Sequence, residues 1–417
     1  MKQDIAFSNA PSASSAAQEL CSQLPRSLTS YGAVIFFASS KYDFAELSGL
    51  LRKAFPNAEV IGATTSGEIS QKGFTSNSVI LNALYDADGR SRFKGVLIDN
   101  ANQFPAVHRN DIIQAASSVG IQLSSPEIHR DSFAISLICG LKNAEEGTLS
   151  LLYALINDPD FLVCGGTAGD DLAFKATFVS CNGICSDCAA VILFVKTQSP
   201  FVIYKENIFK KSGKTVRLTD VQHETYLVKR IDNQSPRQRY AEVLGISESA
   251  VNDAILDHPF GRSFGDSVFI ASLVQFHQDG SLNTYARVIQ DSIQEILEPM
   301  DTLAITEETC KSILEKIPRP SCVILFNCIL RTLGFDKKHQ KEAVASIWSR
   351  YFPHFSGFST YGEQFGHVNS NQTLVALVIG GLKSWKKHIR MHRLSAQERI
   401  WWRCCLPYAS RTTAFRA

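Results

Sequence analysis

Three short segments of this 417-residue sequence place threonine, glycine and a carboxylate at the same spacing. The shared residues are Thr65, Gly67 and Glu68 in "TTSGEI", Thr167, Gly169 and Asp170 in "GTAGDD", and Thr360, Gly362 and Glu363 in "STYGEQ". Glycine lets a backbone approach a ligand closely, and hydroxyl and carboxylate groups offer hydrogen bonds. The pattern therefore indicates polar binding turns, with the carboxylates as acceptors for a cationic or amino group.

Other kinds of site fit this pattern poorly. A carboxylate in the loop would repel a phosphate, and the turns have neither the lysine of a phosphate-binding loop nor the GxGxxG of a dinucleotide fold. A structural role is the alternative. The three glycines would then supply bends that need positive φ, and each acid would fix its turn by accepting hydrogen bonds from nearby amides. The sequence leaves both interpretations open.

The segments around the three turns repeat as well. A strand-like run and then a run with helical apolar spacing precede each turn, a second strand leads into it, and a third follows it. The runs before the turns are 33–39 with 44–55, 133–139 with 145–156, and 321–330 with 341–352, and the strands after them are 78–85, 189–195 and 372–380. We therefore expect an α/β fold of three repeated β-α-β-turn-β units that form mixed sheets.

The spacing of the units predicts two domains. The first two units lie close together in the sequence, whereas a strand-rich stretch precedes the third. The expected parts are an N-terminal segment at 1–29, a first domain at 30–220, a second domain at 221–381 that contains the third unit, and a tail at 382–417.

Composition and charge limit the class of protein. The chain is 45% hydrophobic and 20% charged, with no apolar run long enough to span a bilayer and no signal-peptide block at its start, so we expect a cytoplasmic protein. From residue 381 onward nine lysines and arginines stand against one acid, together with three of the four tryptophans. Such a tail can bind a membrane surface or nucleic acid, but a poorly ordered extension is the simpler interpretation, and we expect no nucleic-acid partner.

Three of the eleven cysteines suggest a rival chemistry. Cys181, Cys185 and Cys188 have the Cx3Cx2C spacing of a three-thiolate iron–sulfur site. However, Asn182 and Gly183 lie between two strand-like runs, which predicts a hairpin that would keep the thiols apart. We expect reduced thiols, and an iron–sulfur enzyme is the alternative.

Longer segments carry a resemblance to a known family. "VIGATTSGEI", "GLKNAEEGTLSLLYAL" with "CGGTAGDDLAF", "HPFGRSF" with "HQDGSL", and "LFNCILRTLG" with "GFSTYGEQFGHVNSNQTLVALVIG" resemble the FIST family of intracellular sensory proteins. The last pair is similar to the nitric-oxide-sensing subgroup (NosP), in which a haem-binding FIST protein modulates a histidine kinase or a cyclic-di-GMP enzyme. The resemblance makes 30–220 a FIST N domain and 221–381 a FIST C domain.

This resemblance implies a sensor rather than an enzyme. The implied ligand is a small molecule, and the implied signalling partner is a histidine kinase or a cyclic-di-GMP enzyme. To the expected ligand-binding residues of the turns we add Gly166, Arg331, Tyr361, Asn371 and Gln372. Haem is the implied cofactor, and His354 and His367 are the candidate iron ligands, since iron commonly takes an imidazole from an apolar pocket. His258 and His277 are further candidates. Without haem, an amino acid or similar metabolite is the expected ligand.

Overall fold

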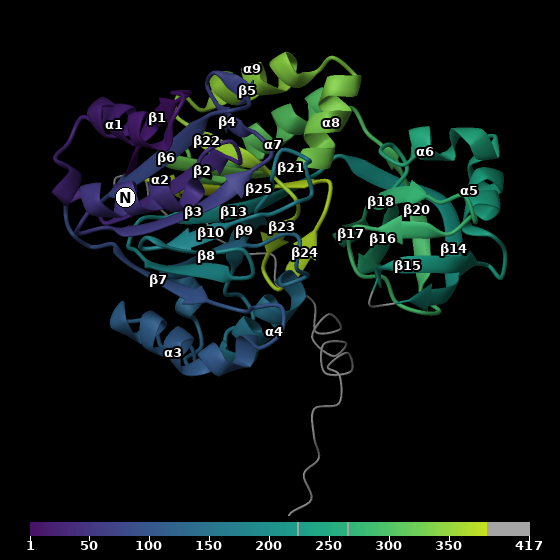
Figure 1. Cartoon of the computed structure of the whole chain (residues 1–417), viewed down its shortest axis with the longest axis horizontal. Helices are drawn as coiled ribbons and strands as arrows, with labels where there is room; N and C mark the ends of the chain where they lie inside the picture. The colour runs from purple at the N-terminus through teal and green to yellow at the C-terminus, as the bar shows by residue number, and fades with distance from the viewer. Residues whose placement is uncertain (223–224, 265–266, 382–417) are drawn as a thin grey trace, which may run out of the picture.

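The computed structural model of the chain describes residues 1–222, 225–264 and 267–381. It has a large body and a smaller lobe beside it, and the middle of the chain forms the lobe (Figure 1). The body contains three six-stranded sheets and the lobe one seven-stranded sheet. The expected α/β class with mixed sheets is confirmed, and the expected basic tail at 382–417 lies outside the described residues.

The three sheets of the body follow one plan. In each sheet the first three strands pair antiparallel, each with the next, and the fourth strand is parallel to the third. A short two-stranded hairpin then pairs antiparallel with the fourth strand and completes the sheet. The first sheet contains β1 (Lys2–Ser8), β6 (Val79–Tyr85), β2 (Ala33–Ser39), β3 (Glu59–Thr65), β10 (Val179–Cys181) and β11 (Ile184–Ser186). The second contains β7 (Arg92–Ile98), β12 (Ala190–Lys196), β8 (Ser132–Ile138), β9 (Val163–Thr167), β23 (Glu363–Phe365) and β24 (Val368–Ser370). The third contains β13 (Phe201–Asn207), β25 (Thr373–Gly380), β21 (Pro320–Cys328), β22 (Ser356–Thr360), β4 (Glu68–Ser70) and β5 (Gly73–Thr75).

Each hairpin belongs to a different unit from the sheet that it completes. The hairpin of the first unit, β4 and β5, pairs with β22 of the third unit. The hairpin of the third unit pairs with β9 of the second, and that of the second pairs with β3 of the first. The predicted repeat is therefore present, with a hairpin between its turn and its last strand, and a cyclic exchange of hairpins ties the three units together.

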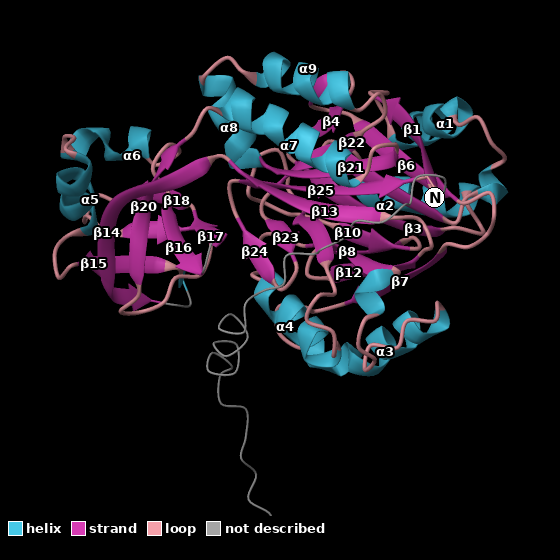
Figure 2. Ribbon diagram, turned by 180° about the vertical axis from the view of Figure 1, so that it is seen from behind, coloured by secondary structure: helices cyan, strands magenta, loops and turns pink. Residues whose placement is uncertain are grey.

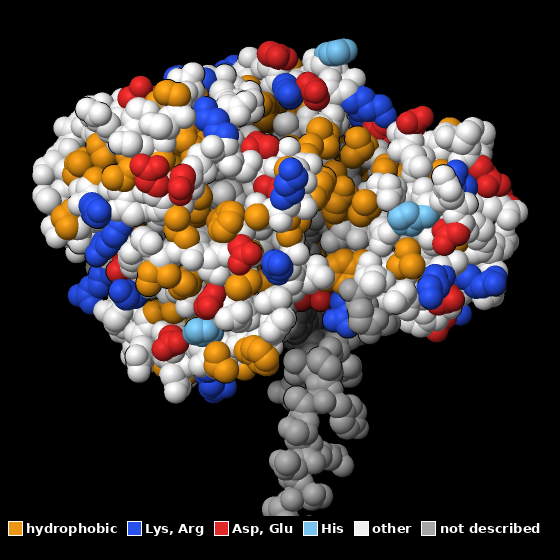
Figure 3. All heavy atoms as spheres, viewed as in Figure 1, with side chains coloured by type: hydrophobic (Ala, Val, Ile, Leu, Met, Phe, Trp, Pro, Cys, Tyr) orange, Lys and Arg blue, Asp and Glu red, His pale blue; other side chains and the backbone are white. Residues whose placement is uncertain are grey.

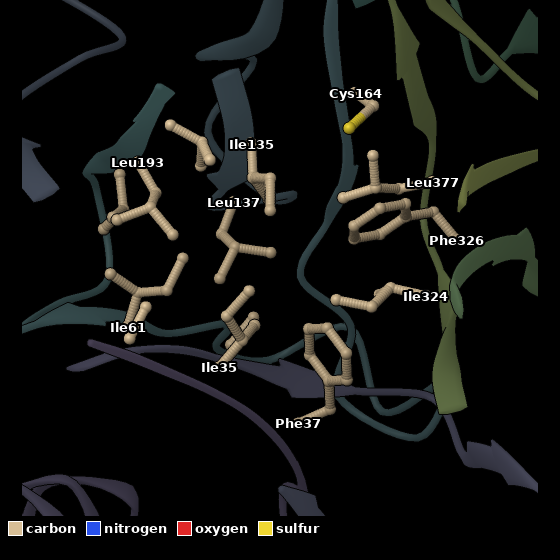
Figure 4. Packing of buried hydrophobic residues seen from close by; sticks show 14 of the residues in the cluster. Ile35, Phe37, Ile61, Ile135, Leu137, Cys164, Leu193, Ile324, Phe326 and Leu377 are labelled. Carbon is tan, nitrogen blue, oxygen red and sulfur yellow. The ribbon is translucent and has the colours of Figure 1, made fainter. Parts of the chain in front are cut away.

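The inner faces of the three sheets share one hydrophobic core, seen in Figure 4. The residues that the figure labels there are Ile35, Phe37, Ile61, Ile135, Leu137, Cys164, Leu193, Ile324, Phe326 and Leu377. Phe37 stacks on Phe358 across the first and third units, with ring centroids 4.4 Å apart. The third unit thus packs with the first two rather than with the middle of the chain, because its inner face is as apolar as theirs. The domain limits given above stay a prediction.

Helices cover the outer faces of these sheets (Figure 2). They are α1 (Ala13–Gln23) and α2 (Phe44–Ala54) on the first sheet, α3 (Arg109–Ser118) and α4 (Glu145–Leu155) on the second, and α7 (Thr302–Lys316), α8 (Ile329–Lys337) and α9 (Lys341–Tyr351) on the third. In α2 the Asp43 carboxylate caps the first turn, and Phe44, Leu47 and Leu51 form the buried stripe. No helix of the described part is both long and apolar enough to cross a membrane.

The lobe is a curved antiparallel sheet with its own core (Figure 2). In spatial order its strands are β17 (Ser267–Ala271), β16 (Phe260–Phe264), β20 (Ile293–Pro299), β14 (Phe209–Gln222), β15 (Leu227–Ile231), β19 (Leu282–Thr284) and β18 (Leu273–Phe276), and its helices are α5 (Pro236–Leu244) and α6 (Val251–Ala254). Figure 3 shows hydrophobic side chains gathered beside α8, where the body meets the lobe. There Cys328, Ile329 and Leu330 of the body pack with Leu256 and Tyr285 of the lobe.

Candidate functional site

The three Thr-Gly-acid turns meet at one end of the body, at the carboxyl ends of the parallel strands. Backbone hydrogen bonds link them in a closed circle: Ser66 N to Ser359 O at 3.0 Å, Tyr361 N to Thr167 O at 3.0 Å, and Gly169 N to Thr64 O at 2.9 Å. We call residues 64–68, 166–170 and 359–363 the turn ring. Ligands of α/β proteins commonly bind at this end of the strands, so the ring is the first place to look for a site.

Two of the three acids lie inside their own turns. Glu68 is 1% exposed and Glu363 is fully buried. The hydroxyl donors are Thr65 Oγ1 at 2.5 Å and Ser78 Oγ for Glu68, and Thr360 Oγ1 and Thr373 Oγ1, the latter at 2.8 Å, for Glu363. Loss of water on burial raises the pKa of Glu68 to about 8 and that of Glu363 to about 7. Both acids therefore fix their turns, and Glu68 is mostly protonated at neutral pH.

Asp170 has a different role from the other two acids. Its carboxylate is 1% exposed and accepts four hydrogen bonds. The donors are the backbone N–H groups of Phe174, Lys175 and Ala176, at 3.0, 2.6 and 3.1 Å, and the Tyr361 phenol at 2.5 Å. Asp170 thus organises the loop that follows it rather than its own turn, so its sequence match to Glu68 does not extend to the structure.

Residues 171–174 of this loop, which we call the strap, have a strained backbone. Asp171, Leu172 and Phe174 have φ values of 54°, 64° and 50°. Positive φ in residues other than glycine costs roughly 1–3 kcal/mol each and is concentrated at ligand clamps and switches. Tyr361 holds the strap, since its phenol oxygen accepts the Leu172 N–H at 3.0 Å and its ring stacks on Phe174 at 5.4 Å. The strained strap is therefore held in place by the third turn.

The glycines serve the turn ring in two ways. Gly67 has a φ of 110°, which supports the expected bend. Gly169 and Gly362 do not have positive φ, so that expectation is wrong for these two. Instead, a Cβ on Gly169 would lie 2.4 Å from Ser66 Oγ, and one on Gly362 would lie 3.0 Å from Asn369 Oδ1. Gly169 thus leaves room for the first turn, which packs directly against it, and Gly362 leaves room for the Asn369 side chain of its own hairpin.

Beside the first turn lies a hollow of about 440 Å³. Its walls come from the β2–α2 connection, the first turn, the β5–β6 connection, the strap and the start of α8. The lining residues are Ser40, Lys41, Ser66, Ser76, Asn77, Asp171, Leu172 and Ile329. The volume is in the range of small-molecule sites. We call this space the turn hollow.

The turn hollow presents hydroxyls together with one amine and one carboxylate. Ser66 is 8% exposed, and its Oγ has no hydrogen bond of acceptable geometry, although the Tyr361 phenol is near. Buried polar atoms nearly always have a partner. Asp171 is oriented by Ser39 and Ser40, whose hydroxyls donate to its Oδ2 at 2.9 and 2.7 Å. The exposed Lys41 supplies the positive charge.

The ligand-binding residues expected from the sequence lie within the turns or in the elements packed against them. The turn hollow is lined instead by residues next to them in the sequence, such as Ser66 and Asp171. Thr167 accepts a hydrogen bond from Gln364 at 2.9 Å, and a Cβ on Gly166 would lie 2.4 Å from the Thr360 side chain. These residues hold the turns together. Sequence reasoning missed Ser66 and Asp171, although each is next to a residue that it identified. Ligand contact by the expected residues stays a prediction.

Arg331 lies deeper in the third unit, within an ion pair. Its guanidinium donates to the Glu206 carboxylate, and the two side chains are 1% and 0% exposed. Arg331 Nε and Nη1 and Glu206 Oε2 have no partner among the described residues. This pair is therefore buried away from solvent, and loss of either partner would leave the other charge buried and unpaired, which is strongly destabilising.

Asn371 and Gln372 connect the turn ring to the lobe. Asn371 donates to the Tyr361 carbonyl at 3.1 Å, and Gln372 donates to the Leu256 carbonyl at 2.8 Å. Gln372 also accepts from the Ser272 hydroxyl at 2.7 Å. The third turn is thus connected to the lobe through two adjacent residues, of which Asn371 contacts the turn and Gln372 contacts the lobe.

The candidate haem ligands do not come together. His354 is exposed, and His367 packs edge-on against Tyr153 with ring centroids 5.6 Å apart. Burial lowers the pKa of His367 to about 4. His258 and His277 belong to the lobe, and none of the four histidines lines the turn hollow. Haem binding stays a prediction.

Cys181 and Cys185 lie on the expected hairpin, and Cys188 follows it. Asn182 and Gly183 form its turn with φ of 51° and 87°. Cys181 packs into the shared core, Cys185 packs on the opposite side with the residues of α1 and α2, and Cys188 lies beside Asp99. Within the described residues no group of cysteines is placed to hold a metal ion. The spacing that suggested an iron–sulfur site therefore reflects a hairpin.

Comparisons with known proteins identify both halves of the chain. Residues 32–234 match the FIST N domain and residues 236–366 match the FIST C domain. No curated protein matches the chain at a significant level.

Among solved structures, the chain shows a distant likeness to a cyanuric acid hydrolase described as an evolutionary innovation by structural concatenation. The identity is 10% and the TM-score 0.36, over 91% of this chain and 99% of that one. A cyanuric acid hydrolase from A. caulinodans gives 8% identity and a TM-score of 0.24, over 47% of this chain and 72% of that one. The two domain matches together span residues 32–366, and the chain belongs to the FIST family of sensory proteins.

Proposed function

We propose that this protein is a cytoplasmic sensor that binds a small zwitterionic metabolite, of the amino acid class, in the turn hollow. The observation that supports this most is a hollow of about 440 Å³ beside three converging turns, with Ser66, Lys41 and Asp171 in its walls. The Lys41 ammonium suits a ligand carboxylate, and the Asp171 carboxylate suits a ligand ammonium. The Lys41 ammonium lies over the Tyr42 ring, 4.7 Å from its centroid, and Asp171 keeps its negative charge oriented by Ser39 and Ser40.

The strap offers a route from the hollow to the lobe. Asp171 and Leu172 line the hollow, and Tyr361, which holds the strap, packs in one apolar cluster with Leu256 and Tyr285 of the lobe. A ligand that binds one arrangement of the strap better than another shifts the equilibrium between them. A histidine kinase or a cyclic-di-GMP enzyme is the partner that we propose to respond to this change.

Thermal unfolding with each common amino acid at millimolar concentration tests the ligand proposal. A ligand present at about 100 times its Kd adds about 2.7 kcal/mol to the stability of the folded state, so a binder raises the Tm. Asp171→Asn removes the charge that holds the ammonium and is expected to weaken binding about tenfold or more, which is about 1.4 kcal/mol or more. The exposed Asp88, in the β6–β7 connection, supplies the matched control Asp88→Asn. Equal affinity in wild type and Asp171→Asn would place the ligand elsewhere.

Haem with nitric oxide is a second proposal, and His367 favours it. Its lowered pKa keeps the imidazole neutral at pH 7, the form that binds iron. With added haemin, the purified protein is expected to show a sharp Soret band that shifts with nitric oxide and is lost in His367→Ala. The exposed His354 gives the control His354→Ala, which keeps the band. A band that survives in both variants rejects His367 as the ligand, and no band rejects haem.

A further inference from the structure

A second polar cluster lies near the amino ends of β8 and β9, away from the turn ring at their carboxyl ends. It consists of His129, in the short 3-10 helix Ile128–Arg130 before β8, and of Asp158 and Asp160, in the connection from α4 to β9. One ligand-type atom from each of the three lies within 4.8 Å of those of the other two. No motif spacing links these residues in the sequence, so only the fold reveals them.

The Asp158 carboxylate is the centre of the cluster. Its side chain is 2% exposed, and that of His129 is 17% exposed. Asp158 Oδ2 accepts the His129 backbone N–H at 2.9 Å and faces His129 Nδ1 at 2.8 Å, and Asp158 Oδ1 accepts the Asp160 N–H at 3.1 Å. Hydrogen bonds and a positive partner both stabilise a carboxylate that is removed from water. Within the described residues no lysine or arginine pairs with Asp158, whose ion-pair partner is His129.

Either a protonated His129 or a bound cation would supply that charge, and Asp160 favours the cation. A simple His–Asp pair has no use for a second carboxylate, which would add like-charge repulsion next to Asp158. The Asp160 backbone N–H donates to Asp158, whereas no hydrogen bond to its carboxylate is found among the residues that the structure describes. It is half-buried and thus open to an ion from solvent.

We propose that His129, Asp158 and Asp160 bind one Zn²⁺ ion. Zinc takes histidine nitrogen and carboxylate oxygen at about 2.0–2.2 Å in tetrahedral sites, which places ligand atoms roughly 3.4 Å apart. Here the three ligand atoms lie within 4.8 Å of one another, with His129 Nδ1 and Asp158 Oδ2 2.8 Å apart, and water would supply the fourth ligand. The imidazole argues against Mg²⁺ and Ca²⁺, which prefer oxygen ligands. The two backbone N–H groups on Asp158 orient its carboxylate in the way that outer-shell donors orient metal ligands.

Calorimetric titration of the full chain with Zn²⁺, after removal of bound metal by a chelator, tests this site. Single thiols can also take up added zinc, so the decisive quantity is a difference between variants. Wild type is expected to bind one zinc ion more than Asp160→Asn. Because the Asp160 carboxylate has no partner, this variant should keep the wild-type Tm without zinc, which confirms that it folds.

Two further variants make the result specific. His129→Gln keeps an N–H donor near Asp158 but removes the imidazole, and it is expected to lose the same zinc ion. Asp88→Asn lies away from the cluster and is expected to bind as wild type does. Equal zinc binding by wild type, Asp160→Asn and His129→Gln overturns the proposal, as does an equal loss in Asp88→Asn. The site is separate from the turn hollow, so its failure leaves the proposed function untouched.

Discussion

Replacing Arg331 with methionine is expected to lower the free energy of unfolding by about 3–5 kcal/mol, because it leaves a buried carboxylate without its charge partner. Arg331 is the largest of the fully buried side chains, and Glu206 is 1% exposed. Methionine preserves most of the volume, so the change reports mainly the orphaned charge of Glu206. Urea unfolding of wild type and variant, read as the midpoint and slope of the transition, measures the difference.

A double variant separates charge from packing. Arg331→Met with Glu206→Leu replaces the ion pair by two apolar side chains on the face of β13 that meets the helices of the third unit. Such replacements are often neutral or stabilising, and several polar atoms of this pair lack partners. The double variant is therefore expected to recover most of the stability that the single variant loses. A single variant as stable as wild type would show that Glu206 does not depend on Arg331, and the account of this pair would be wrong.

The repeat was predictable from the sequence because its strands are buried on both faces. "AVIFFAS" in the first unit is apolar over nearly its whole length, and all seven residues of β2 are buried. The same runs recur before the second and third turns, so periodicity and repetition sufficed. The hairpin at Asn182 and Gly183 was predictable for a local reason, since both residues accept positive φ.

The exchange of hairpins was not predictable in this way. Glu68 lies opposite Phe358, and Glu363 lies opposite Gly166, so each pairing joins segments far apart in the sequence. A short strand carries no pattern that names its partner, because backbone hydrogen bonds are the same for every pairing. The packing of the third unit with the first two follows from this exchange and was missed with it.

The site was predictable only in part, because contacts between turns that are far apart in the sequence decide which side chains line it. The pattern identified where the turns are, but not which side chains face a hollow. Glu68 points inward, onto Thr65 and Ser78, while Ser66, two residues before it, reaches the hollow. That choice is set by the neighbouring turns, since Gly169 packs against Ser66. Ser66 could have been identified by its position, because it is the residue between the threonine and the glycine of the first turn.

The protonated state of Glu68 leads to the second large prediction, a loss of stability on the alkaline side. The pKa of Glu68 is about 8 in the folded protein against 4.5 for the ordinary side chain. The folded state therefore holds this proton more tightly than the unfolded state. The contribution is complete below about pH 4.5 and is lost as the pH rises through about 8, and it amounts to on the order of 5 kcal/mol.

Glu68→Gln imitates the protonated acid and should remove this dependence. The variant is expected to match wild type at about pH 5 and to exceed it by a few kcal/mol at about pH 9, because no buried charge then has to form. Burial also raises the pKa of Glu363 and of Glu145 to about 7. The stability of the variant therefore still falls with rising pH, but less steeply than that of wild type. Urea midpoints across this pH range measure the effect, and Glu308→Gln, at an exposed position in α7, is the matched control. If wild type and Glu68→Gln lose stability in parallel toward alkaline pH, Glu68 is already ionised in its turn and the hydroxyls of Thr65 and Ser78 stabilise the charge.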